Sequence, residues 1–273
     1  MKLDLIVRAR EILTLNPGRP VANRLGVLHG RIVGFDEELD GLDAERTEDF
    51  GAATVTPGLI DAHCHTAWWG LGLAAVDLSG ARGLDELYAL LRAESERLSD
   101  QPGAWLHATG FNQAHHGGAF PELARLDEIT GERPLYLRHT SGHASITNSA
   151  TLRLVGALDP GFADPVGGVV VRDAAGAPTG VIEEAAQGLV QARLLPYATE
   201  RLVTAIEAAT ARYARQGITT FVEAGVGGGW IGHSPVEVTA YRAAADRGRL
   251  HARAQLMPAL DALRPLTGHA DDF

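Results

Sequence analysis

The sequence predicts an α/β fold in which a parallel sheet, covered by helices, follows a small β module. From residue 59 onward, strand-like runs alternate with amphipathic helical runs, which is typical of such a sheet. Residues 3–55 contain only short strand-like runs. Polar clusters follow several of the later strands, at the ends where these folds hold their ligands. We therefore expect two domains, residues 1–57 and 58–273.

The N-terminal module is predicted from hydrophobic runs separated by turn-forming residues. Asn16-Pro17-Gly18 and His29-Gly30 are suited to tight turns. The predicted strands around these turns are Leu3–Val7, Glu11–Leu15, Leu25–Leu28 and Arg31–Phe35.

Periodicity and terminal signals predict the helices of the second domain. Leu84, Leu87 and Leu91 form a stripe on one face of its first clear helix. Gly217 is suited to the left-handed position after a helix ends, and Ser234 with Glu237 has the pattern of a capping box. The predicted helices are 84–98, 122–129, 149–155, 200–216 and 235–248.

Short apolar runs between these helices predict the strands of the sheet, beginning with a buried strand at Leu59–Ala62. We count about five or six strands, fewer than the eight of a closed barrel. Residues 157–180 are rich in Gly, Pro and Asp and predict an excursion with a small hairpin. The predicted strands of the sheet are 59–62, 105–109, 134–139, 180–184, 218–223 and 251–257.

Composition and charge exclude several classes of function. With 45% hydrophobic and 21% charged residues, the chain has the composition of a soluble globular enzyme. A formal net charge of -10 disfavours nucleic acid or an anionic membrane as a partner. The chain has a single cysteine, Cys64, no signal-peptide core, and no apolar run near the ~20 residues of a membrane span. These features predict a cytoplasmic protein.

The first polar cluster is the His-x-His segment that follows the strand at residues 59–62. Side chains in a strand alternate between its faces, so Asp61, His63 and His65 share one face. Two imidazoles in this arrangement can hold a metal ion if further ligands arrive from elsewhere; the alternative is a polar strand end with solvated histidines. The other polar strand ends favour the metal: they are Asn112/Gln113, His139/His143, Glu183/Glu184 and Glu223.

Several ordered motifs resemble one known family. Pro57–His65 after a β module is similar to the amidohydrolase superfamily. Four later motifs narrow the resemblance to the amidohydrolase-3 family (YtcJ-like, N-substituted formamide deformylase-like): they are Gly110–Gln113, Ser141–Ser149, Pro178–Ala185 and Gly217–Ala224. The resemblance implies a metal-dependent TIM-type (β/α)8 barrel joined to a β-sandwich that is built from both chain ends.

The resemblance also implies roles for individual residues. His63 and His65 would be metal ligands, with Asp61 behind them to orient an imidazole. Glu184 would ligate or bridge the metal, with a carboxylate at the start of a helix as the alternative. His143 would be the catalytic residue that contacts substrate, with a hydrogen bond that orders the loop as the alternative. The implied cofactor is one or two divalent metal ions, with Zn²⁺ expected.

Other polar and aromatic residues have weaker claims. Asn112 and Asn148 are candidates that can equally cap local backbone. Trp68 and Trp69 follow the His-x-His segment, and they can line an apolar pocket or simply pack in the core. Three further histidines are expected on the surface: His115, His116 and His233.

The sequence departs from the family in two ways. Lys2 is the only lysine in the chain, so the barrel region has no lysine to carboxylate as a bridge between two metals. Family members also continue well beyond the equivalent of Phe273, with further metal-binding histidines, a catalytic aspartate and the strands that complete the sandwich. We therefore expect the N-terminal part of a longer enzyme, with the general base beyond residue 273.

Three functions remain open from the sequence. The first is hydrolysis of a non-peptide C–N bond, as in an amide or formamide, by metal-activated water. The second is a heterocycle deaminase or cyclic amidohydrolase on the same scaffold. The third is a truncated, non-catalytic remnant. The expected partner is a small amide-type substrate, without nucleic acid or membrane, and self-association into a homo-oligomer is left open.

Overall fold

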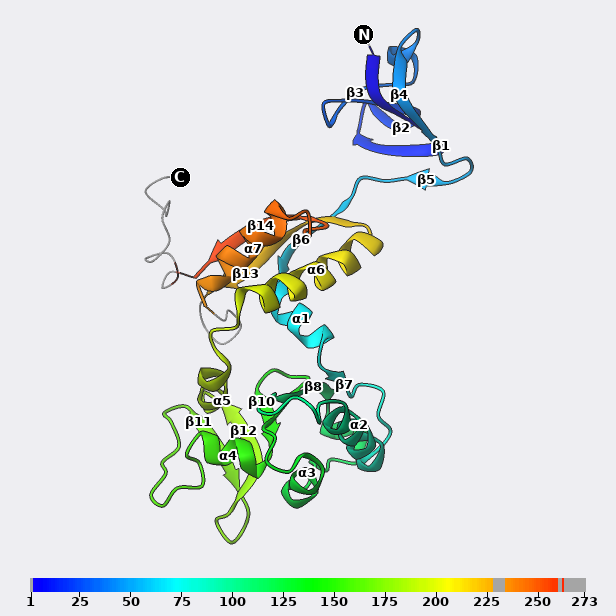
Figure 1. Cartoon of the computed structure of the whole chain (residues 1–273). Coiled ribbons are helices and arrows are strands. Elements are labelled where there is room, and N and C mark those ends of the chain that lie inside the picture. The colour runs from blue at the N-terminus through cyan, green and yellow to red at the C-terminus, as the bar shows by residue number, and fades with distance from the viewer. Residues whose placement is uncertain (1, 228–233, 260–261, 263–273) are drawn as a thin grey trace. The chain divides into compact units, whose positions relative to one another are not determined.

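The computed structural model describes residues 2–227, 234–259 and 262 (Figure 1). The chain divides into two compact units, Met1–Ile60 and Asp61–Phe273. Each unit is described by itself. Among the described residues, no helix has both the length and the apolar character that a membrane crossing requires.

The first unit contains one five-stranded sheet in the order β3-β2-β1-β4, with β5 also paired to β1. Strand β1 pairs antiparallel with β2 and parallel with β4 and β5. A second sheet, as a sandwich requires, is not among the described residues of this unit. Its elements are β1 (Lys2–Asn16), β2 (Arg19–Leu28), β3 (Arg31–Phe35), the 3-10 helix η1 (Asp36–Leu39), β4 (Asp43–Asp49) and β5 (Thr54–Val55).

Strand β1 is longer than the sequence predicts, because it joins two predicted strands into one. Its pairing with β2 continues across a register shift between Arg8 and Ile12, which is the mark of a bulge. Small clusters of buried side chains support this sheet: one contains Leu3, Ile6 and Leu39, and the other contains Ala9, Ile12 and Ala22.

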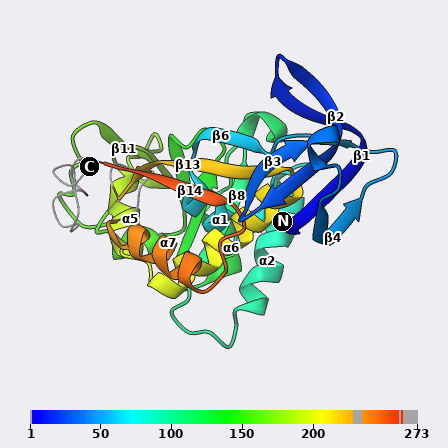
Figure 2. The same cartoon turned by 90° about the horizontal axis from the view of Figure 1, so that it is seen from above.

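The second unit alternates strands and helices, which confirms the α/β class (Figure 2). Its helices are α1 (Thr66–Leu73), α2 (Leu84–Arg97), η2 (Gln113–His116), α3 (Leu123–Thr130), α4 (Ser149–Leu154), α5 (Gln187–Leu194), α6 (Thr199–Arg215) and α7 (Val236–Asp246). Its strands are β6 (Leu59–Cys64), β7 (Val76–Asp77), β8 (Leu106–Phe111), β9 (Leu135–His139), β10 (Ala144–Thr147), β11 (Gly168–Arg172), β12 (Pro178–Glu184), β13 (Ile218–Val226) and β14 (Arg253–Pro258).

The described strands of this unit form two open sheets rather than one closed barrel. The six-stranded sheet has the order β11-β12-β10-β9-β8-β7, and the three-stranded sheet has the order β14-β13-β6. Strands β7, β8 and β9 are parallel, but β10 pairs antiparallel with β9 and β12. The predicted strands of this sheet, β8, β9 and β12, therefore run in one direction, and the antiparallel strand β10 is an addition that was not predicted. The connection 140–143 between β9 and β10 is too short for the crossover that a parallel pair needs.

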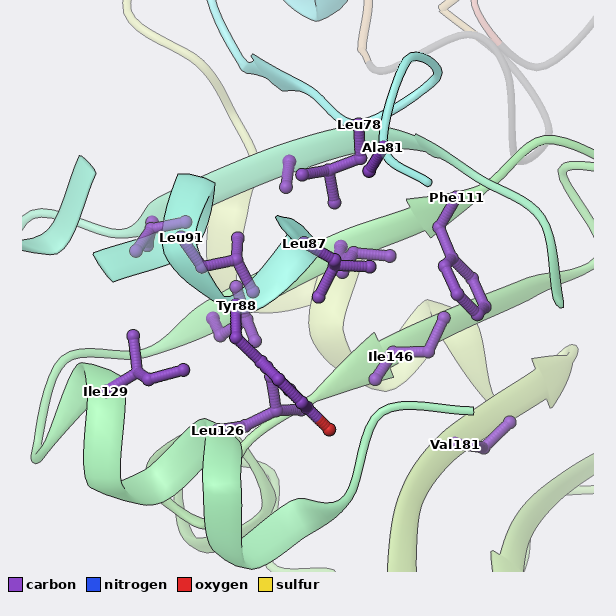
Figure 3. Close-up of a cluster of buried hydrophobic side chains, with 14 of the residues drawn as sticks. Leu78, Ala81, Leu87, Tyr88, Leu91, Phe111, Leu126, Ile129, Ile146 and Val181 are labelled. Atoms are coloured by element: carbon purple, nitrogen blue, oxygen red, sulfur yellow. The ribbon is translucent and has the colours of Figure 1, made fainter. Parts of the chain in front are cut away.

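Helices α2 and α3 cover one face of the six-stranded sheet. A large hydrophobic cluster lies between these helices and the sheet (Figure 3). Leu87 and Leu91 are fully buried there, which confirms the predicted stripe on α2. Leu106 of β8 and Leu135 and Leu137 of β9 belong to the same cluster. Because strand side chains alternate, the residues between these leucines face the opposite side of the sheet.

Two details near the three-stranded sheet differ from prediction. Strand β6 was expected to be buried, but Leu59 is 59% and Ile60 is 69% exposed, because β6 is the edge of its sheet. The capping box of α7 differs from prediction: the Ser234 hydroxyl accepts from the N–H of Val236 at 3.2 Å, and the N–H of Glu237 donates to the Ser234 carbonyl at 3.0 Å. The Glu237 carboxylate accepts from the N–H of Gly227 at 2.8 Å. Gly217 after α6 has a φ of +81°, as predicted.

Candidate functional site

His63 and His65 lie next to each other where β6 passes into α1. Their ring centroids are 5.2 Å apart in an edge-to-face arrangement. The Nδ1 atom of His65 lies 3.0 Å from the carbonyl oxygen of Ala224 in β13. A carbonyl only accepts, so this Nδ1 donates, and the Nε2 atom keeps its lone pair. This is the arrangement that metal-binding histidines use. The Asp61 carboxylate accepts from the backbone N–H of His63 at 3.0 Å, so its observed contact is to the backbone rather than to an imidazole.

A buried hydrogen-bond network fixes this end of β6. The Glu223 carboxylate, 5% exposed, accepts from the backbone N–H of Thr66 at 2.7 Å and from the Tyr241 hydroxyl. Burial raises the pKa of Glu223, and hydrogen bonds from Tyr241 and Thr66 partly oppose that rise. Glu223 therefore ties the start of α1 to β13 and α7, one residue after His65.

His143 and Glu184 form a second pair, at the end of β12. His143 Nδ1 donates to the Glu184 carboxylate at 3.1 Å, with the two side chains 63% and 58% exposed. The backbone N–H of Glu184 donates to the carbonyl of His143 at 2.9 Å. Glu184 has a φ of +52°, a left-handed conformation that is uncommon for a residue with a side chain and that often marks functional sites. Both residues line one open groove together with Gly142, Gly167 and Gln187.

The two pairs do not merge into one ligand set. In residues 2–227, 234–259 and 262, no three His, Cys, Asp or Glu side chains lie close enough together to hold a metal ion. The structure therefore brings together His63 with His65, and His143 with Glu184. It does not bring Glu184 to the two histidines of β6.

Most of the weaker candidates act on local structure. Asn112 accepts from the N–H of Ala114 at 3.0 Å, and the fully buried Asn148 caps α4 by accepting from Thr151 at 3.0 Å. His115 is exposed, as expected. His116 is half-buried, and its ring stacks on that of Phe111 with 5.2 Å between the centroids. His233 lies outside the described residues.

The two tryptophans after the His-x-His segment have different environments. Trp69 stacks on Tyr213 with 5.5 Å between ring centroids, which is core packing. Trp68 lies beneath the guanidinium of Arg138, 4.6 Å from its ring centroid, and lines a cavity. The prediction that one of them walls a pocket is met by Trp68, but that pocket is not purely apolar.

Sequence reasoning missed two features of this region. Thr66 and Tyr241, which hold Glu223, carried no motif, although the polar Thr directly after His65 was a usable signal. Arg138 lies in a strand between Leu137 and His139, and the alternation of β9 places it on the face opposite Leu137.

Comparisons with known proteins agree with this α/β arrangement. A family model described as "Amidohydrolase family" (Amidohydro_3) matches residues 46–272. The chain therefore belongs to this amidohydrolase family, as the resemblance of its motifs indicated.

Individual relatives are similar over most of this chain. The N-substituted formamide deformylase of Arthrobacter pascens is 33% identical over 68% of this chain and 35% of its own length. The putative amidohydrolase YtcJ of Bacillus subtilis is 30% identical over 75% of this chain and 38% of its own length. Protein LONG AFTER FAR-RED 3 of Arabidopsis thaliana is 30% identical over 81% and 38%, respectively. The chain thus spans well under half the length of these curated relatives.

Among solved structures, an uncharacterized metal-dependent hydrolase from Pyrococcus horikoshii superimposes with a TM-score of 0.70 at 20% identity. The match covers 96% of this chain and 50% of that one. A related structure from Pyrococcus furiosus gives a TM-score of 0.67. At these identities the likeness shows the fold alone.

Proposed function

We propose that this chain carries part of a metal-dependent amidohydrolase site that hydrolyses a non-peptide C–N bond, such as that of an amide or formamide. The observation that carries the proposal is the His63/His65 pair at the end of β6. Its rings are adjacent, and the Ala224 carbonyl holds His65 in the tautomer that leaves Nε2 for a metal. The 33% identity to an N-substituted formamide deformylase supports the choice of substrate class.

The residues present fit a metal in part. His63 and His65 would supply two nitrogen ligands, which suits Zn²⁺, while a catalytic zinc usually takes three protein ligands. Glu184 is the proposed third ligand, and its pairing with His143 in this structure makes it the assignment that needs a separate test. A divalent ion held by these residues would supply Lewis acidity for the substrate carbonyl and for the attacking water.

The chain's own residues have distinct tasks in this proposal. The buried Glu223 network holds the β6–α1 junction, so the two imidazoles are positioned before any ligand binds. His143 is the proposed catalytic contact to the substrate. Its Nδ1 lies 3.1 Å from the Glu184 carboxylate, and both residues line the groove beside Gly142 and Gly167.

Metal analysis tests the proposal directly. The purified full chain, dialysed against trace Zn²⁺, is expected to retain the ion stoichiometrically, and His63→Ala/His65→Ala is expected to lose it. His115→Ala is the matched control, because His115 is exposed and lies outside both pairs. Equal zinc retention by the double variant and the control would exclude this metal site. Glu184→Gln, measured in the same way, decides the third ligand.

A substrate screen tests the chemistry separately. Zinc-loaded chain is expected to release amine from a linear N-substituted formamide, and more slowly in His143→Ala. Activity on cyclic ureides or amino-heterocycles, with none on linear amides, would replace this proposal by the deaminase or cyclic amidohydrolase alternative. A chain that binds zinc but hydrolyses none of these substrates would show a metal-binding remnant.

A further inference from the structure

A second set of chemically active side chains lies on the face of β8 and β9 opposite the leucine cluster. His107 of β8 and Tyr136 and Arg138 of β9 alternate with Leu106, Leu135 and Leu137. They line a cavity of about 40 Å³, together with Trp68 of α1 and with Tyr197 and Arg201 near the start of α6. Apolar side chains such as Leu71 and Leu194 also line the cavity, so it combines charged, polar and apolar groups on a sheet face where apolar packing is the usual arrangement.

This cavity carries positive charge without lining carboxylates. Arg138 lies over the Trp68 ring at 4.6 Å, and Arg201 lies over the Tyr197 ring at 4.7 Å. No Asp or Glu is among the described residues that line the cavity. Some other arginines of the chain have acidic partners: Arg172 pairs with Asp164 and Arg249 with Glu200. Arg138 and Arg201 instead pack against aromatic rings.

The neighbouring groups are neutral hydrogen-bonding partners. Burial, followed by the charges of Arg201 and Arg138, lowers the pKa of His107 to about 4, so its ring is uncharged at neutral pH. Burial raises the pKa of Tyr136 and of Tyr197, so both hydroxyls keep their protons. Burial also lowers the pKa of Arg138, yet an arginine stays protonated at any physiological pH. The charge balance therefore favours an anion, which the hydroxyls and the imidazole can accompany with hydrogen bonds.

The size of the cavity restricts the anion. A volume of about 40 Å³ accommodates a group of a few heavy atoms, since a single water needs roughly 10–15 Å³ on the same measure. A planar carboxylate matches the planar guanidinium fork and carries a single negative charge. A tetrahedral phosphate dianion is larger and more strongly hydrated.

We propose that Arg138 and Arg201 form a binding site for the carboxylate group of a small organic acid, with Trp68 and Tyr197 supporting the two guanidinium groups. None of these four residues belongs to the His63/His65 or His143/Glu184 pair, although Gln191 lines both this cavity and the groove of His143 and Glu184. The carboxylate belongs either to a free acid or to one end of a larger ligand.

Calorimetric titration of the full chain with acetate, at fixed ionic strength and pH 7, tests the proposal. We expect saturable binding with one site per chain, and a dissociation constant about tenfold higher in Arg138→Gln and in Arg201→Gln, as for loss of a charge-assisted hydrogen bond. Acetamide, the uncharged analogue, is expected not to bind. Arg125→Gln is the matched control, because Arg125 also lies over a tyrosine ring, Tyr88, but is paired with Glu128.

Each other outcome overturns the proposal or part of it. Absence of saturable acetate binding by the folded chain overturns it, and so does equal binding by wild type and both arginine variants. Tighter binding of inorganic phosphate, with the same dependence on the two arginines, replaces carboxylate by phosphate as the ligand. If Arg138→Gln fails to fold, Arg201→Gln decides alone, because Arg201 is exposed and its loss leaves the core intact. Succinate binding more tightly than acetate would indicate a larger ligand.

Discussion

The two pairs of candidate residues are positioned by different physical means. The His63/His65 end of β6 is held by a buried carboxylate, Glu223, which receives hydrogen bonds from Thr66 and Tyr241. The His143/Glu184 end of β12 is held by an exposed pair and by a strained backbone at Glu184. The first pair rests on a fixed framework, while the second owes its geometry to local conformation. Rigid support suits metal ligands, and an exposed pair suits contact with substrate.

Truncation of the buried carboxylate is the strongest test of this contrast. Glu223→Ala is expected to lower the free energy of unfolding by about 3 kcal/mol, because the Thr66 N–H and the Tyr241 hydroxyl lose their acceptor inside the protein. Glu184→Ala is expected to cost less than about 1 kcal/mol, since Glu184 is 58% exposed. Urea unfolding of both variants measures the difference. Similar losses in the two variants would remove the distinction between the two ends.

The isosteric substitution Glu223→Gln is expected to change the free energy of unfolding less than Glu223→Ala does, and its effect depends on pH. Burial raises the pKa of Glu223 above its ordinary value of 4.5, so the folded state holds this proton more tightly than the unfolded state. The stabilisation is complete below the unfolded pKa and is lost as pH rises through the folded pKa. Glu223→Gln keeps the accepting oxygen and has no proton to lose, so this decline above pH 4.5 is expected to disappear. Unfolding free energies at several pH values between 4 and 8 measure it.

The control for this pH effect is Glu184→Gln, which removes one carboxylate from the exposed pair. The burial of Glu223 is the cause of the effect, so the two variants are expected to differ in their dependence on pH. Identical pH profiles for the two variants would mean that burial at Glu223 has no effect on its ionisation.

Backbone strain at Glu184 is expected to have the next largest effect on the free energy of unfolding. Glu184→Gly and Glu184→Ala both remove the carboxylate, but only glycine adopts a φ of +52° without a steric penalty. We expect the glycine variant to be more stable than the alanine variant by roughly 0.5–1 kcal/mol. Glu183, its neighbour in β12, is the matched control: there glycine is expected to be the less stable of the two. The same order at both positions would argue against strain at Glu184.

The local elements of this chain were predictable, because they depend on nearby residues. The stripe on α2, the stop at Gly217 and the Asn148 cap all follow from spacing within one or two turns. The pairing of distant strands was not predictable in the same way. The antiparallel pairing of β10 with β9 and the exposure of Leu59 and Ile60 depend on which strands become neighbours.

The candidate site shows the same division. The His-x-His spacing and the family motifs identified His63, His65, His143 and Glu184 as sequence features. Their supporting contacts come from far along the chain: Ala224 holds His65, and Tyr241 holds Glu223. Periodicity carries no information on such long-range contacts, so the pairing of His143 with Glu184 required the structure.

The exposed His143/Glu184 pair is expected to contribute least to the free energy of unfolding. A double-mutant cycle with His143→Ala and Glu184→Ala is expected to give a coupling free energy of about 0.5 kcal/mol, because water screens a pair whose side chains are 63% and 58% exposed. A coupling above about 2 kcal/mol would mean that the pair is shielded from water in solution, and the contrast with the Glu223 network would then fail. If coupling stays small while His143→Ala still slows hydrolysis, the pair's role lies in contacting substrate rather than in stabilising the fold.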